Sequence, residues 1–302
     1  MNYKIIVTLI PFIIVFGSFV AILLLLYAYG QSRKGRRSPL IRQLLRSPGE
    51  SLRVQIEDLS DKINDYLMKA LFFPLAMYSI YLTQKYIGGI KEDAFVLMVY
   101  TSVAIATIIF CFIKLWRLLK QRTALRLGLD CELAVGQELN HLMLAGCRIY
   151  HDFPAEKFNI DHIVVGSKGV FAIETKGRAK PDKKGGTEEA KVVYDGQSLR
   201  FPNWSESEPL EQAISQASWL SKWLNNAVGE PVAVQPVLAL PGWYVVREKP
   251  ADLFIFNGKN PDFMLKCSNT SLSETLINRI IYQVEQRCRD IEPVAYAKKP
   301  HQ

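Results

Sequence analysis

Three long apolar runs fill much of the first 116 residues of this chain: Ile5–Tyr29, Leu67–Ile87 and Ala94–Trp116. A helix crosses a bilayer when about 20 consecutive residues are predominantly apolar. The first run is also longer than the ~7–15 apolar residues of a cleavable signal peptide. A soluble helical core is the alternative, but three such runs so close together disfavour it. We therefore predict membrane spans near residues 5–29, 67–87 and 94–116.

Basic residues beside these runs indicate their orientation. Arg33–Arg46 contains six basic residues and no acidic one, and basic clusters next to a span mark its cytoplasmic side. We expect a multi-pass protein of a bacterial-type inner (plasma) membrane, with the N-terminus outside and loop 30–66 and the C-terminal domain in the cytoplasm. Within this loop, Ser51–Asp65 has apolar residues at helical spacing and predicts a short amphipathic helix at the cytoplasmic surface. DNA binding by Arg33–Arg46 is the competing interpretation. A second basic group follows the third run and comprises Lys114, Arg117, Lys120, Arg122 and Arg126.

Beyond the apolar runs, the stretch NIDHIVVGSKGVFAIETK predicts two β-strands joined by a short turn. A four-residue connection, Gly166–Gly169, would pair Val165 with Val170 and therefore Asp161 with Glu174. Directly opposed side chains have Cβ atoms about 5 Å apart, and like charges there are destabilising. A three-residue turn would instead place the two acids on opposite faces.

Two opposed carboxylates in an apolar hairpin need a compensating cation, because unpaired buried charge is costly. A divalent metal with oxygen ligands would supply it. Lys176 lies two residues after Glu174 and projects from the same face of the strand. The opposing interpretation is a solvated edge strand on which the D…ExK pattern arises by chance. His162 points to the other face, which favours a structural role.

Four short motifs together resemble a known family. They are GQE at 136–138, IDHIVV at 160–165, GVFAIETK at 169–176 and LPGW at 240–243. They resemble the nuclease-related domain (NERD), which is placed in the PD-(D/E)xK, restriction-endonuclease-like superfamily. The resemblance covers about residues 125–260. It implies an α/β fold with a restriction-endonuclease-like α-β-β-β-α-β core, in which helices flank a mixed sheet, preceded here by an α-helical transmembrane region.

The resemblance also implies a metal centre. Asp161 and Glu174 would hold Mg²⁺ (or Mn²⁺), with the backbone carbonyl of Thr175 as a further ligand. Lys176 would orient or polarise the attacking water. The metal would lower the pKa of bound water and stabilise charge on the scissile phosphate.

Two predicted helices would add further site residues. Thr123–Leu144 carries Glu138, which the resemblance makes an extra acid of the site, although a solvated helix charge is an equal alternative. Pro209–Val228 has a buried apolar stripe and carries Gln212, the candidate polar residue near the metal. Trp219 and Trp223 on the same helix favour core packing over base stacking. Strands are predicted at 147–153, 191–194, 198–201, 232–240 and 252–257, and a last helix ends near residue 289. Asp195-Gly196 is a hairpin turn signal between the strands at 191–194 and 198–201.

Gly177–Lys191 is a polar, glycine-rich loop that follows the predicted site. Its basic residues could collect phosphates, whose contacts dominate nucleic-acid affinity; a merely solvated loop would have a similar composition. The net charge of +8 suits an anionic partner, nucleic acid or acidic lipid. The tentative nucleic-acid-binding residues are Arg178, Lys180, Lys183 and Lys184.

The five cysteines form no CxxC pair, which argues against a zinc site or a disulfide framework and suits a reducing compartment. We expect residues 1–121 to form a membrane region, 122–292 a cytoplasmic nuclease-like domain and 293–302 a flexible tail. The predicted function is that of a membrane-anchored Mg²⁺-dependent nuclease that hydrolyses phosphodiester bonds of nucleic acid, with DNA favoured over RNA. Its partners would be nucleic acid and the lipid bilayer. A non-catalytic nucleic-acid-binding module and a membrane scaffold are the alternatives.

Overall fold

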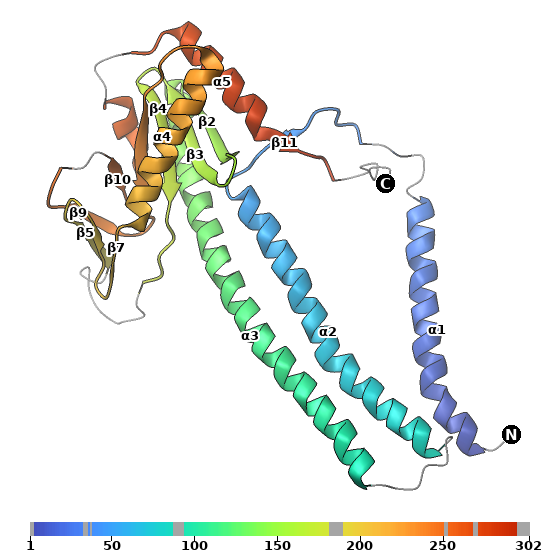
Figure 1. The fold of residues 1–302 in the computed structure, drawn as a ribbon. Helices are drawn as coiled ribbons and strands as arrows, with labels where there is room; N and C mark the ends of the chain where they lie inside the picture. The colour runs from blue at the N-terminus through green and yellow to red at the C-terminus, as the bar shows by residue number, and fades with distance from the viewer. Residues whose placement is uncertain are drawn as a thin grey trace. The chain divides into compact units, whose positions relative to one another are not determined.

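The computed structural model describes residues 3–32, 36, 38–86, 94–180, 190–250, 253–267 and 271–294 (Figure 1). Its contacts divide the chain into two compact units. The first unit comprises Met1–Ile41, Leu59–Gln121 and Pro293–Gln302, and the second comprises Arg42–Asp58 and Arg122–Glu292. Residues 42–58 therefore belong with the C-terminal part of the chain, although they precede two of the predicted spans.

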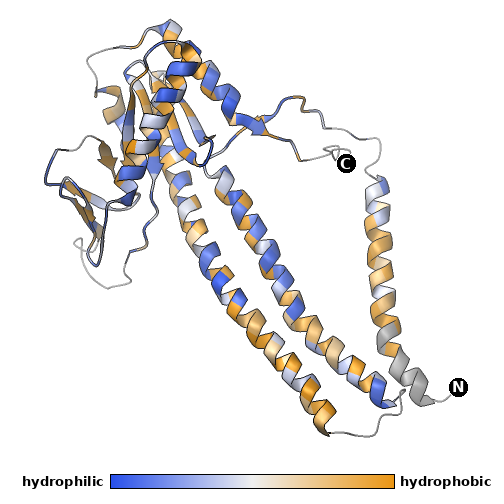
Figure 2. Cartoon of the chain, in the orientation of Figure 1, coloured by the Kyte–Doolittle hydropathy of each residue, from blue (hydrophilic) through white to orange (hydrophobic). Residues whose placement is uncertain are grey.

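Three long helices contain the predicted spans: α1 (Tyr3–Ser32), α2 (Glu50–Tyr86) and α3 (Ala94–Leu139). By length and composition each could cross a membrane. Their apolar side chains, Phe16 and Phe95 among them, are largely exposed in the protein. In Figure 2, hydrophobic residues dominate the first part of α3 and the later part of α2. Such exposed apolar surface suggests a membrane anchor.

The helices run farther than the sequence patterns predicted. A separate amphipathic helix was expected at 51–65, yet α2 runs through it and through Pro74 without interruption. Likewise α3 continues past Trp116 and includes most of the helix predicted at 123–144. The last residues of that predicted helix form a 3-10 turn, η1 (Asn140–Ala145). The change from apolar to charged residues does not end α3, because Leu, Lys and Arg are all good helix formers. The connection at 88–93 lies outside the described residues.

The second unit is built on a five-stranded mixed sheet with the order β10-β8-β4-β3-β2. Strand β3 pairs antiparallel with β2 and β4, whereas β8 pairs parallel with β4 and β10. The parallel β4–β8 pair requires a crossover, and helix α4 supplies it. The strands are β2 (Arg148–Pro154), β3 (Asn159–Gly166), β4 (Gly169–Thr175), β8 (Val234–Ala239) and β10 (Phe254–Phe256), and the helix is α4 (Glu208–Val228).

The β3–β4 hairpin has the register that the sequence predicted. Val165 pairs with Val170, and Gly166 pairs with Gly169 across the turn. Gly169 has a φ of 137°, a conformation that residues with a Cβ rarely adopt. Since the register fixes which side chains share a face, Asp161 and Glu174 lie on the same face of neighbouring strands.

Apolar side chains bury both faces of this sheet. Helices α4 and α5 (Glu274–Cys288) cover one face (Figure 1), where Leu220, Leu224 and Ile280 are fully buried. The other face packs against the end of α3, η1 and a second 3-10 helix, η3 (Pro261–Leu265), through residues such as Leu139 and Met264. Each fully buried side chain of this kind stabilises the fold by about 1.5–3 kcal/mol.

A second sheet of four strands, ordered β7-β6-β5-β9, adjoins the first. The Asp195-Gly196 turn between β5 and β6 was predicted, and Asp195 Oδ1 accepts hydrogen bonds from the backbone N–H groups of Gln197 and Ser198. Strand β9 was not predicted: it follows the Pro-Gly-Trp turn and pairs parallel with β5. The strands are β5 (Lys191–Tyr194), β6 (Leu199–Arg200), β7 (Ser205–Glu206) and β9 (Tyr244–Arg247).

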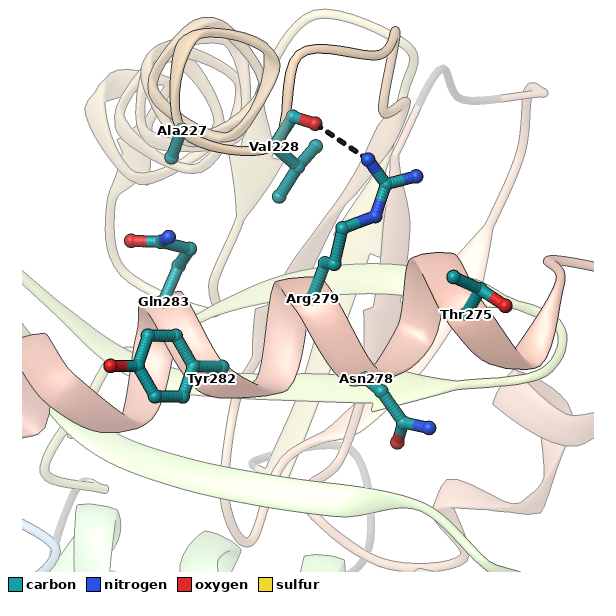
Figure 3. A pocket seen from close by; sticks show the side chains of 7 residues that line it. All are labelled: Ala227, Val228, Thr275, Asn278, Arg279, Tyr282 and Gln283. Carbon is teal, nitrogen blue, oxygen red and sulfur yellow. Dashed lines mark hydrogen bonds between the residues drawn. The ribbon is translucent and has the colours of Figure 1, made fainter.

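The C-terminal end of α4 is tied to α5 by an arginine. Arg279 Nη1 donates to the carbonyl of Val228 at 3.0 Å, in the last turn of α4 (Figure 3). A cation at a helix C-terminus also interacts favourably with the helix dipole. The two helices border a shallow hollow of about 420 Å³ lined also by Tyr282 and Gln283. None of its lining residues is one of the predicted site residues.

The contacts that residues 42–58 make with the rest of the second unit include those of one arginine and a short strand pair. Strand β1 (Leu44–Leu45) pairs antiparallel with β11 (Arg289–Ile291). Arg46 donates from Nη1 to Asp152 at 2.7 Å and from Nε and Nη2 to both carboxylate oxygens of Asp290 at 2.8 Å. The Asp152 side chain is only 5% exposed, so this ion pair is largely desolvated.

Candidate functional site

The site begins with two carboxylates on the central strands of the larger sheet. Asp161 comes from β3 and Glu174 from β4, where Glu174 is only 3% exposed. The backbone N–H of Thr175 donates to Asp161 Oδ2 at 2.6 Å. This contact fixes the Asp161 side chain against the end of β4. The hairpin thus brings together the two acids that the sequence predicted.

Lys176 reaches back to the buried acid of the same strand. Its Nζ lies 2.6 Å from Glu174 Oε1, and 22% of the Lys176 side chain is exposed. The lysine therefore connects a buried carboxylate with solvent. Its placement agrees with the alternation of side chains along a strand.

The α4 side chain that contacts Glu174 is Gln216, whereas the sequence predicted Gln212 as the polar residue near the metal. Gln216 Nε2 donates to Glu174 Oε2 at 2.6 Å, and the side chain is buried. Gln212 lies one turn earlier and is only partly buried. Both belong to the same stripe of the helix, because residues four apart share a face. The choice between them depends on where α4 crosses β4, which the sequence pattern did not fix.

The acid that α3 brings to this region is Glu132. Its side chain is buried, and its pKa is raised to about 8, first by burial and then by the nearby carboxylates of Asp152 and Glu174. The predicted acid, Glu138, is only partly buried. Glu132 lies three residues before Val135, which is buried, and so shares the buried face of the helix. This spacing is visible in the sequence and could have indicated Glu132.

Mutual repulsion affects the two strand acids as well. Burial raises the pKa of Asp161 well above its ordinary value, and the neighbouring charges of Glu174 and Glu132 raise it further. Burial also raises the pKa of Glu174, although the hydrogen bonds and charge of Lys176 oppose this shift. Three acids therefore share a region with one lysine, and a bound cation would favour their ionised forms.

The donor atoms fit a hard divalent cation such as Mg²⁺, which prefers oxygen ligands. Besides the carboxylates, the buried Thr175 Oγ1 and Gln216 Oε1 have no hydrogen-bond partner among the described residues. Within the same residues, no three His, Cys, Asp or Glu side chains converge closely enough to hold an ion. The Glu174 carboxylate is turned toward Lys176 and Gln216 instead.

The predicted phosphate-binding residues are differently placed. Arg178 forms a two-pronged ion pair with Glu206, at 2.8 Å from both Nε and Nη2. Lys180 is exposed, with Nζ 5.8 Å from the centre of the Trp243 ring. Lys183 and Lys184 lie outside the described residues. Of the two described residues, Lys180 is the more accessible cation near the end of β4.

Two further groups predicted to be structural are packed in the core. His162 is fully buried, and its Nδ1 lies 2.8 Å from Nδ1 of His151. Burial lowers the pKa of His151 to about 4 and that of His162 well below its ordinary value, so neither ring carries a charge at neutral pH. Trp219 and Trp223 pack edge-on against Phe153, as the sequence favoured.

Comparison with known proteins identifies the region that holds this site. The family model described as the nuclease-related domain, NERD, matches residues 127–241. The chain contains a NERD domain. The match includes Glu132, Asp161, Glu174, Lys176 and Gln216, and it implies a nuclease-related function with nucleic acid as the general class of substrate. Searches of curated proteins and of solved structures gave no match.

Proposed function

We propose that the NERD domain is a metal-dependent nuclease that hydrolyses phosphodiester bonds of nucleic acid, with DNA the favoured substrate. The observation that carries this proposal is the apposition of Asp161 and Glu174 with Lys176 on the same face. Apart from β5, β6 and β7, which lie between β4 and α4, the chain order α3-β2-β3-β4-α4-β8 agrees with the α-β-β-β-α-β core of restriction-endonuclease-like enzymes. The domain boundaries remain those of the sequence analysis, except that we add residues 42–58 to the domain.

In this proposal the acids form the ligand set for Mg²⁺ or Mn²⁺. Asp161 and Glu174 would hold the ion, together with the Thr175 carbonyl. When bound, the ion would lower the pKa of a coordinated water and stabilise charge on the phosphate. Glu132 would lie close enough to add its charge to the site, since it already perturbs the pKa of Asp161.

The remaining side chains orient these acids and the substrate. Gln216 holds Glu174 Oε2, which fixes the rotamer of a ligand carboxylate. Lys176 bonds the other oxygen and carries a positive charge at the solvent side, where it would orient the attacking water and attract a phosphate. Lys180 would contact the nucleic-acid backbone, because it is exposed four residues after Lys176.

We also propose that α1, α2 and α3 anchor the domain in the inner membrane, with the N-terminus outside and the NERD domain in the cytoplasm. The basic residues at both inner flanks support this orientation. Reporter fusions at Gly89, in the connection outside the described residues, and at the C-terminus would test it. An external C-terminus would refute both the orientation and access to cytoplasmic nucleic acid.

The test of catalysis uses the full-length protein in detergent with labelled DNA and RNA. Wild type should cleave in Mg²⁺ and lose activity in EDTA. Asp161→Asn and Glu174→Gln should each reduce cleavage by at least about 100-fold, because each removes a metal ligand. Arg200→Met, a charge change at an exposed site, should leave the rate unchanged. Absence of cleavage by wild type with any divalent ion would refute the proposal.

A non-catalytic binding module is the second candidate. The observation that favours it is that both acids already bond to groups of the protein itself. Lys176 and Gln216 each bond one oxygen of Glu174, and the Thr175 N–H donates to Asp161. Such a domain would bind nucleic acid equally well in Mg²⁺ and EDTA and release no product. Gel-shift titrations beside the cleavage assay distinguish the two candidates.

A further inference from the structure

The first turn of α2 makes hydrogen bonds to the sheet that carries the proposed site. Both the backbone N–H and the hydroxyl of Ser51 donate to Asp152 Oδ2, at 3.0 and 2.7 Å. Asn159, the first residue of β3, donates from Nδ2 to Asp152 Oδ1 at 3.1 Å and to the Ser51 hydroxyl. Asp152 is almost fully buried. Ser51 therefore helps to hold the residue with which β3 begins.

Asn159 continues this hydrogen-bonded chain into the site. Its backbone carbonyl accepts from Gln216 Nε2 at 3.3 Å, and the same nitrogen donates to Glu174 Oε2 at 2.6 Å. A side-chain amide nitrogen carries two hydrogens, so one Gln216 side chain serves both acceptors. Ser51 is thus linked to Glu174 through Asn159 and Gln216.

A second contact joins the same turn to Glu132. The backbone N–H of Gly49 forms a hydrogen bond with the Glu132 carboxylate. Gly49 has a φ of 68°, and a Cβ at this position would lie 3.5 Å from Glu132 Oε2 and collide with the Leu129 side chain. Only glycine fits here without strain, because other residues disfavour this φ. The close approach allows the backbone itself to bind the acid.

We propose that residues 49–51, where α2 begins, position the carboxylates of the candidate metal site. Gly49 holds Glu132, and Ser51 holds Glu174 through Asn159 and Gln216. This inference rests on the proposed nuclease function. These are positioning residues, because none of them contacts the ion or the substrate. Since α2 continues from this turn into the second candidate span, the same helix would serve as anchor and as support for the site.

The test compares three serine variants of the full-length protein in detergent. Ser51→Ala removes the hydroxyl between Asp152 and Asn159, whereas Ser51→Thr retains a hydroxyl. Ser47→Ala is the matched control, since the Ser47 hydroxyl bonds Glu50 and Arg53 within the same segment. The first measurement is the Mn²⁺ concentration that half-maximally raises the melting temperature. The second is amide hydrogen exchange without metal, in peptides that cover β4 and α4.

Loss of a residue that orients a metal ligand commonly weakens metal binding by about 10–100-fold. We therefore expect Ser51→Ala to raise the Mn²⁺ midpoint at least about tenfold and to speed exchange around Thr175 and Gln216. Ser51→Thr and Ser47→Ala should both remain within about twofold of wild type.

The two measurements separate this inference from the nuclease proposal. If wild type binds Mn²⁺ and Ser51→Ala matches it in both measurements, the positioning role is wrong and the metal site stands. If wild type gains no stability from Mn²⁺ and Ser51→Ala still speeds exchange at both peptides, the positioning role stands without the metal site. Equal effects of Ser51→Ala and Ser47→Ala would indicate general loosening of the segment and would refute the positioning role.

Discussion

Arg46→Met should destabilise the second unit strongly, because it leaves a buried carboxylate without its cation. Arg46 bridges Asp152, whose side chain is 5% exposed, and Asp290, whose side chain is 38% exposed. Removing one partner of a buried ion pair costs about 3–5 kcal/mol, whereas an exposed pair contributes about 0–1 kcal/mol. The loss therefore arises mainly at Asp152. For a unit of this size, 1 kcal/mol corresponds to about 2–4 °C, so the melting temperature should fall by roughly 10 °C.

Tryptophan fluorescence is the appropriate assay, because Trp204, Trp219, Trp223 and Trp243 all belong to the second unit. The matched control is Arg200→Met, since Arg200 also bridges two acids, Asp195 and Glu248, but is 48% exposed. It should lower the melting temperature by no more than about 3 °C. An equal effect of the two variants would refute the argument from burial.

A double variant tests whether the unpaired charge of Asp152 causes the loss of stability, or whether another effect of losing Arg46 does. Asp152 has a φ of 48°, which asparagine tolerates, so Asp152→Asn removes the charge and keeps the backbone. In the Arg46→Met background it should recover part of the lost stability, because no uncompensated carboxylate remains. If Asp152→Asn is as harmful in the Arg46→Met background as it is in the wild type, the unpaired charge is not the cause.

Three further outcomes are expected. Lys176→Ala should retain the Mn²⁺-dependent rise in melting temperature yet lose turnover, because it removes the group proposed to orient the attacking water and spares both carboxylates; loss of both would make Lys176 a structural residue. The unfolding free energy should fall by up to about 3 kcal/mol as the pH is lowered from about 6.5 to about 4, because the folded-state pKa of His151 is about 4 and its ordinary value is 6.5; this contribution is complete above pH 6.5, and His151→Asn should flatten the decline in pH-dependent melts. Leu224→Ala should cost about 2–5 kcal/mol in chemical denaturation, because the side chain is fully buried between α4 and the sheet.

The hairpin could be predicted from sequence because its register depends only on local features. Of the two connections considered, the four-residue one pairs Val165 with Val170, as the structure shows, and strand alternation then places Asp161, Glu174 and Lys176 on one face. No knowledge of distant residues was needed. The same local reasoning located the Asp195-Gly196 turn.

Residues that reach the site from helices were harder to predict, because their choice depends on how elements dock. Gln212 and Gln216 occupy the same stripe of α4, and only the crossing of α4 over β4 selects Gln216. Glu132 differs in that its helical spacing from the apolar Val135 is visible in the sequence, whereas the GQE motif favoured Glu138. Strand β9 was missed because its four residues gain their partner, β5, from about 50 residues earlier in the chain.

Segment 42–58 matters for any definition of the nuclease-related domain. A fragment that starts at residue 122 would keep every carboxylate of the candidate site, but it would lose Arg46 from Asp152 and the Gly49 N–H from Glu132. Both acids are buried, so the fragment would leave Asp152 without its cation and Glu132 without its backbone partner. The contacts that compensate them lie immediately before and within the first turn of α2. The folded domain is therefore discontinuous in sequence. The chain leaves it along α2 after residue 58 and returns to it along α3 at residue 122.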